Sequence, residues 1–448
     1  MNVFDLSDDD GRDQDVSRVR DEAASKNAVR NRMLIDKVDV PPDRLVGVVA
    51  CGRDFFHTFI NGTIGRRYKR PPIYLVDSCV TTALGAFMAG GRRRLPGVRS
   101  GHGSQYDLDV SAPVSGLGPT LALFRALHDV QEILRGVRLL RIDAATRRLE
   151  ELCLGLIQRK EKVDTLAHEA QQLGELVQRA IAALQRDLFV GPYVEPALAQ
   201  QLQAAIAVLL RAAEAAVHAP MPEIPGTGFS TTRGSGVLFG GIPELDIEGP
   251  AILLAPARIL GWAQGFGSLR AISHDIPDDW MEEWFGVKDP RHRAGAIALV
   301  NVLHHEMTHA MVDLPNDPIE DAQDLFAQRW RFYDQHPEFE EGFCNATAAV
   351  STGVTLLKAM YEIKGRGLPK LHEGKYAAHW DEVFCALSPT WQDYHGDPTN
   401  IWLNAWQSNK RDFKAFSGLI GLYATNFSGF DWMATFAAFQ RGQISTGR

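Results

Sequence analysis

The stretch 119–218 constrains the fold of this chain most strongly. It is rich in Leu, Ala, Arg, Glu and Gln and is interrupted only near Gly191 and Pro192. Apolar residues recur within it at spacings of three and four, which is typical of long amphipathic helices that pack on one another or on a partner. Because the heptads drift, the pattern favours a helical bundle over a two-stranded coiled coil.

The rest of the chain divides into three further parts by its composition. Residues 1–45 are strongly charged and predict a tail with one exposed helix, whereas 46–118 is a small mixed segment of β-type apolar runs and Gly, Pro and Arg clusters. The Pro/Gly-rich beginning of 219–448 marks a domain boundary, and we expect a short sheet around 237–255. The chain is therefore expected to be mainly α, in the α+β class, with a helical bundle region before a C-terminal domain.

Composition and charge narrow the class of protein. Of the 448 residues, 45% are hydrophobic and 23% are charged, which is ordinary for a globular protein, and the net charge of −8 argues against a general nucleic-acid binder. No run of about 18 apolar residues predicts a membrane span. The N-terminal sequence lacks the pattern of an export signal, and the cysteines form no CxxC pair. We expect a cytoplasmic protein without nucleic-acid or membrane contacts, although dedicated secretion machinery reads other signals.

One apolar helix is expected between Asp289 and Pro315. An aspartate followed by a proline is a typical helix start, and the second proline ends the helix. A helix that is apolar nearly all round is expected to be buried. This buried helix contains the segment of the chain with the greatest catalytic potential.

That segment has the sequence HEMTH, residues 305–309. His305 and His309 lie one helical turn apart, so both imidazoles point from one face and can bind one metal ion. Glu306 lies about 100° round the helix, where its carboxylate can act on a water bound to that ion without being a ligand. His304 points away from this face, and we interpret it as a neighbour on the helix surface.

A second expected helix, 337–353, supplies candidates for a third ligand. Glu341 is favoured because the small residues on its face would let this helix approach the first one closely. Asn345, one turn further on, could hold a ligand histidine by a hydrogen bond. Three rival ligands lie nearby in sequence: Glu340, Glu338 and His336.

The HEMTH helix with a glutamate downstream resembles the active-site helix of the thermolysin-like zinc peptidases, and a glutamate as third ligand is the mark of the gluzincins. The resemblance covers roughly 290–353 and implies a zincin-like metallopeptidase domain. It implies three ligands for one catalytic Zn²⁺ ion: His305, His309 and Glu341. Glu306 would be the general base, and Asp313 would hydrogen-bond a ligand histidine.

The chain departs from these peptidases in two places. They usually carry an acidic residue one turn after the ligand glutamate, where this chain has Asn345, and the spacing from His309 to Glu341 is longer than in thermolysin. The metzincin pattern is absent, since Val312 and Pro315 occupy the places of its glycine and histidine. No GxMEN motif precedes the helix, which disfavours a gluzincin aminopeptidase.

The implied reaction is hydrolysis of a peptide bond in a peptide or protein substrate. Zinc lowers the pKa of a bound water towards about 7, and Glu306 takes its proton and passes it to the leaving amine. The oxyanion requires a second electrophile from the C-terminal part. Tyr394 and His395 are the first candidates for this role, and three alternatives are Tyr376, His379 and Tyr423.

Two other classes of function stay open. The first is a catalytically inactive zinc-binding interaction protein whose functional part is the helical region 119–218. That region could bind a partner protein or form a homo-oligomer. The second is a secreted metallopeptidase effector or toxin that uses the same chemistry.

Overall fold

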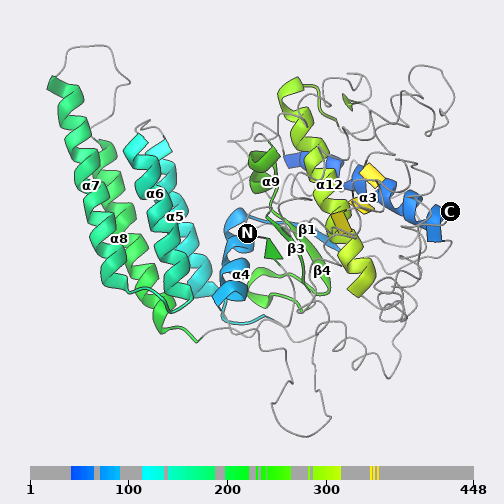
Figure 1. Cartoon of the computed structure of the whole chain (residues 1–448), viewed down its shortest axis with the longest axis horizontal. Coiled ribbons are helices and arrows are strands. Elements are labelled where there is room, and N and C mark those ends of the chain that lie inside the picture. Colours follow the sequence, from blue (N-terminus) through cyan, green and yellow to red (C-terminus); the bar gives the residue numbers. More distant parts are fainter. Residues whose placement is uncertain are drawn as a thin grey trace, which may run out of the picture.

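The computed structural model (Figure 1) places a group of long helices beside a part of the chain that is built on a small sheet. The residues that it describes are 42–64, 71–90, 114–135, 140–186, 197–220, 229–230, 234–238, 240–263, 281–282, 286–313, 344–345, 347–348 and 351–352. The expected tail at 1–45 therefore lies almost entirely outside the described residues. The described part of the chain is mainly helical with a short sheet, as expected.

Four helices form the expected bundle: α5 (Gly118–Arg135), α6 (Leu140–Ile157), α7 (Val163–Arg186) and α8 (Ala197–His218). Helix α5 packs on α6 and α8, and α7 packs on the same two helices. The amphipathic pattern explains this packing, because the buried residues of α7 recur every three or four positions: Leu166, Ala170, Leu173, Val177 and Ile181.

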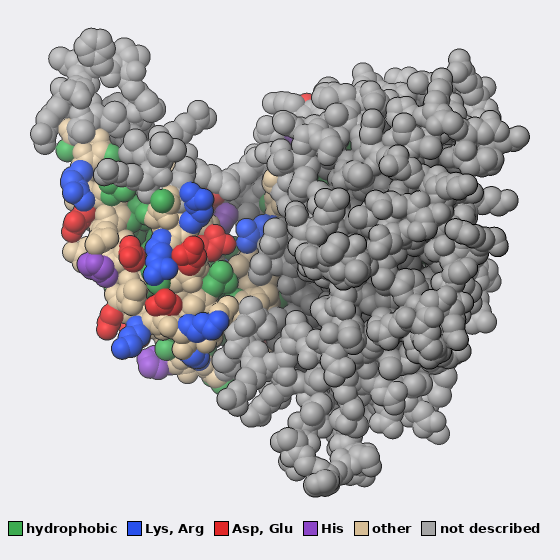
Figure 2. All heavy atoms as spheres, in the orientation of Figure 1, with side chains coloured by type: hydrophobic (Ala, Val, Ile, Leu, Met, Phe, Trp, Pro, Cys, Tyr) green, Lys and Arg blue, Asp and Glu red, His purple; other side chains and the backbone are tan. Residues whose placement is uncertain are grey.

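The outer surface of the bundle carries charges of both signs. Figure 2 shows basic and acidic side chains interspersed over the described face, and Arg148 lies 3.2 Å from Glu151 one turn along α6. Val208 is the exposed large hydrophobic residue among those described. Such a surface is ordinary for a solvated helix face, so binding of a partner protein or a second copy through 119–218 stays a prediction.

The sheet contains β1 (Ile73–Leu75), β2 (Phe229–Ser230), β3 (Ser235–Leu238) and β4 (Ala251–Leu254), in the order β1-β4-β3-β2. Strands β3 and β4 are antiparallel and confirm the short sheet expected around 237–255. Every residue of β1, β3 and β4 is buried, which is typical of strands covered on both faces.

Strand β1 joins the segment 46–118 to the C-terminal part of the chain, although we had interpreted the two as separate. It pairs in parallel with β4, with Tyr74 opposite Leu253. The first apolar run of this segment, at 45–50, is helical, so the expectation of β-type structure there is wrong. That helix, α3 (Pro42–Ile64), packs on α12 (Pro290–Asp313), and α4 (Ser78–Gly90) packs on α5 of the bundle. Backbone hydrogen bonds between strands distant in sequence leave no local pattern, so this pairing could not be predicted.

Helix α12 begins at Pro290, as expected from the aspartate before it, and its last residue, Asp313, lies two positions before Pro315. Every residue from Arg293 to Met311 is buried, because α12 packs on α3, on α9 (Pro256–Ala263) and on strands β3 and β4. None of the helices in the described ranges, α12 included, combines the length and apolar character needed to cross a membrane.

The close approach of α3 to α12 depends on Gly52. A Cβ atom at this position would lie 3.0 Å from Cγ2 of Val300 and 3.2 Å from Cδ2 of Leu303. We expect Gly52→Val to lower the free energy of unfolding by about 1–3 kcal/mol, because overpacking forces such neighbours apart. Urea denaturation measures this loss. The control is Gly261→Val in α9, where a Cβ would have no atom within 4 Å, and equal stabilities of the two variants would contradict the prediction.

Candidate metal site

The predicted motif lies in the second half of α12, where that helix crosses beside the sheet and α3 (Figure 1). His305 and Glu306 are each 4% exposed and His309 is 8% exposed. The structure therefore brings these three residues together in the interior, as the helical spacing predicts. Sequestration from bulk water strengthens electrostatic interactions between such groups and a bound cation.

The two imidazoles face each other. Nε2 of His305 lies 3.1 Å from Nε2 of His309, and the ring centroids are 4.8 Å apart. Two nitrogens bound to one tetrahedral zinc ion at their usual bond lengths would lie about 3.3–3.4 Å apart. The observed spacing is close to that value, so the pair fits two ligands of one ion. Two neutral imidazoles at this distance can also share a hydrogen, one nitrogen donating and the other accepting.

The third ligand falls on residues that the structure does not describe. Glu341 and its rivals Glu340, Glu338 and His336 lie outside the described residues, and within the described ranges no group of three or more His, Cys, Asp or Glu side chains could hold a metal ion. The candidates for oxyanion stabilisation also lie outside: Tyr394, His395, Tyr376, His379 and Tyr423. The predicted hydrogen bond of Asp313 likewise stays a prediction.

Part of the second expected helix is described. Positions 344–345, 347–348 and 351–352 are all helical, which agrees with a helix over 337–353. Asn345 is 5% exposed and Ala348 is 1% exposed, so the small-residue face is buried. The proposed hydrogen bond from Asn345 to a ligand histidine stays a prediction.

His304 is fully buried, so its interpretation as a surface neighbour is wrong. Its ring contacts both neighbouring helices: Nε2 lies 2.8 Å from the carbonyl oxygen of Gly52 in α3, and Nδ1 lies 2.7 Å from Oγ of Ser351 and 3.1 Å from Oγ1 of Thr352. The ring of Phe56 packs against it at 5.2 Å between centroids. The apolar residues on all sides of α12 were the signal that the positions from Arg293 to Met311 are buried.

The protonation state of His304 follows from these partners. A carbonyl oxygen only accepts, so Nε2 carries the hydrogen and donates it to Gly52. Burial lowers the pKa of His304 to about 4, while the hydrogen bond to the Gly52 carbonyl acts in the opposite direction. The ring is therefore neutral at pH 7, and the single lone pair of its bare Nδ1 can accept a hydrogen from either hydroxyl group, that of Ser351 at 2.7 Å or that of Thr352 at 3.1 Å.

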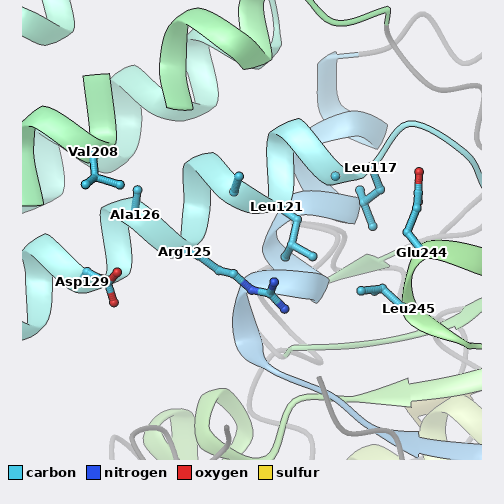
Figure 3. Close-up of a pocket in the computed structure, with 10 residues that line it drawn as sticks. Leu117, Leu121, Arg125, Ala126, Asp129, Val208, Glu244 and Leu245 are labelled. Carbon is cyan, nitrogen blue, oxygen red and sulfur yellow. The ribbon is translucent and has the colours of Figure 1, made fainter. Parts of the chain in front are cut away.

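A hollow lies away from the motif, between α5, α8 and the short helix η1 (Pro243–Leu245) (Figure 3). It encloses about 370 Å³ and is lined mainly by apolar residues of α5 and its neighbours, with the guanidinium of Arg125 extending towards Leu245. Glu244 at its rim accepts a hydrogen bond of 2.7 Å from the backbone N–H of Gly116. None of the predicted site residues lines this hollow.

No family model matches the chain, and no similar curated protein or solved structure was found. The function therefore has to be inferred from the chemistry of α12 and the helices beside it.

Proposed function

We propose that this protein is a zinc-dependent peptidase with a zincin-like C-terminal domain, in which His305 and His309 bind the metal and Glu306 is the general base. One observation carries the proposal: two imidazole nitrogens lie 3.1 Å apart on a buried helix, with a buried carboxylate at the next position. This is the donor pair and the base that an open zinc site requires.

The burial of these groups supports a bound cation. Two imidazoles and a carboxylate lie on a helix whose other buried residues are mostly apolar, and burial of each polar group costs free energy unless it is compensated. A divalent cation bound by both imidazoles would supply that compensation. It would also stabilise the negative charge of Glu306 beside it.

The third ligand is proposed to be Glu341. Thr352 approaches α12 closely enough for its hydroxyl to contact His304, so the face of the second helix that carries Thr352 points towards the metal helix. Glu341 precedes Thr352, and its rival Glu340 precedes Ser351, by eleven residues, which is about three turns of an α-helix. Both glutamates would therefore lie towards α12 if the helix extends to 337, and the small residues on the face of Glu341 are the reason to favour it.

Each residue has a defined part in the proposed hydrolysis. Zinc, when bound, lowers the pKa of a coordinated water to about 7 and polarises the substrate carbonyl. The Glu306 carboxylate accepts the proton as the water attacks the peptide carbonyl, and delivers it to the leaving amine. Tyr394 or His395 is proposed to donate a hydrogen bond to the developing oxyanion.

Zinc content and hydrolysis of a denatured protein substrate test the proposal together. The purified protein is expected to hold one zinc ion per chain and to cleave the substrate. A chelator should abolish cleavage, and added zinc should restore it. A protein that binds zinc but cleaves no peptide bond in a broad peptide library would favour the inactive interaction protein. Absence of zinc binding would contradict the proposal entirely.

The two alternative classes share this metal site. An effector or toxin that is secreted would use the same residues on a host or competitor protein, so it differs in its target and not in its chemistry. In the inactive interaction protein the metal site would be the same, but Glu306 would have no catalytic role.

A further inference from the structure

His304 is adjacent to a proposed metal ligand but belongs to a different contact network. Three hydrogen-bond partners surround its ring: the Gly52 carbonyl of α3 and the hydroxyls of Ser351 and Thr352 in the second helix. Figure 1 shows α3 and the short described piece of the second helix beside α12. One imidazole therefore links three helices whose residues are far apart in sequence.

This link fixes the rotation of α12 about its own axis. Consecutive residues of an α-helix lie about 100° apart, so the direction of His304 determines the direction of His305. The ring nitrogens of a histidine lie roughly 6 Å from the helix axis, so a rotation of about 10° would move them by about 1 Å. Metal-ligand distances tolerate only about 0.2 Å, which makes the rotation of α12 critical.

The partners of His304 resist such a rotation in both directions. Gly52 lies on one neighbouring helix and Ser351 and Thr352 lie on another, and the fully buried ring has no water to replace a broken hydrogen bond. The hydroxyl of Thr308 also bonds to the backbone carbonyl of His304 at 2.7 Å, within the same turn.

We propose that His304 is a positioning residue for the metal site, which holds α12 at the rotation where His305 and His309 reach one ion and ties to α12 the helix that carries Glu341. This inference rests on the proposed function, because it assigns the network a part in zinc binding. His304 itself contacts neither metal nor substrate in this role.

The double variant Ser351→Ala/Thr352→Val tests the proposal, because it removes both hydroxyls from Nδ1 and leaves all three ligands intact. Zinc affinity is measured by competition with a chromophoric chelator, and Co²⁺ substituted for zinc reports the coordination geometry through its visible absorption. We expect affinity to fall about tenfold, the lower end of the range for residues that orient ligands, and the Co²⁺ spectrum to change. The conservative variant Thr352→Ser, with Ser351 unchanged, keeps a hydroxyl group at this position and should show the zinc affinity and the Co²⁺ spectrum of the unchanged protein.

A matched control is available on the same helix. Thr347 is as buried as Thr352, but its Oγ1 has no hydrogen-bond partner among the described residues. Thr347→Val makes the same chemical change and should leave zinc affinity and the Co²⁺ spectrum unchanged. The single variant Thr352→Val gives a milder version of the test if the double variant does not fold.

The outcomes separate this inference from the proposed function. If the unchanged protein binds zinc and the variants at 351 and 352 bind it as tightly as Thr347→Val, with the same Co²⁺ spectrum, His304 has no positioning role. If the unchanged protein binds no zinc, the proposed function is contradicted, and the positioning role that depends on it is contradicted as well. Equal losses for Thr347→Val and Thr352→Val would also overturn the inference, because they would indicate a general effect of packing.

Discussion

Replacement of Glu306 by glutamine is expected to lower kcat/KM for peptide hydrolysis about a thousandfold while zinc stays bound. Glutamine keeps the size of the side chain but cannot accept a proton, and general acid–base catalysis contributes about 10²–10⁴-fold. Because Glu306 is buried next to a proposed ligand and is proposed to act as the base, not as a ligand, metal content should not change. Steady-state kinetics and metal analysis of the purified variant measure the two quantities.

Glu282→Gln is the matched control for this variant. Glu282 is an exposed carboxylate that forms an ion pair with Lys288 at 2.5 Å, so the same chemical change there should alter neither activity nor zinc content. Undiminished hydrolysis by Glu306→Gln would eliminate Glu306 as the base. Loss of zinc together with activity would instead indicate that the carboxylate coordinates the metal.

Replacement of Glu341 by alanine is expected to weaken zinc binding by more than about a hundredfold. Loss of a residue that merely orients a ligand costs about 10–100-fold in metal affinity, and loss of a ligand itself should cost more. The measurement is the zinc content after dialysis, followed by chelator competition for any variant that retains metal.

Glu340→Ala separates the favoured ligand from its main rival. The two glutamates are neighbours in sequence but differ by about 100° around a helix, so they approach α12 from different directions and the two variants should differ in zinc binding. Undiminished zinc in Glu341→Ala would rule out this residue, and loss of zinc in Glu340→Ala would assign the ligand to the rival. His305→Ala should lose zinc in either case.

Much of this architecture could be predicted because it depends on short-range patterns. The three- and four-residue spacing of apolar side chains predicts helices α5 to α8, and Asp289 and Pro290 predict the first turn of α12. The facing imidazoles of His305 and His309 follow from the helical period alone, since residues four apart share a face. These features are set within one or two turns of the chain.

Other features could not be predicted from those patterns. The pairing of β1 with β4 and the packing of Gly52 against Val300 each join segments that are distant in sequence, and the backbone groups that pair between strands are the same in nearly every residue. His304 was misinterpreted for a related reason. A helical pattern gives the direction of a side chain but not what lies in that direction, and here two other helices do.

The sequence by itself determined the four helices α5 to α8, where α12 begins, and which side chains of the HEMTH motif share a face, because these depend on local periodicity and capping. Only the tertiary structure decided that a strand of the segment 46–118 completes the sheet and which elements enclose α12. It also decided that His304 joins three helices. Those outcomes depend on burial and on hydrogen bonds between distant segments. Such contacts stabilise the protein only after folding has brought the segments together, at a cost in loop-closure entropy.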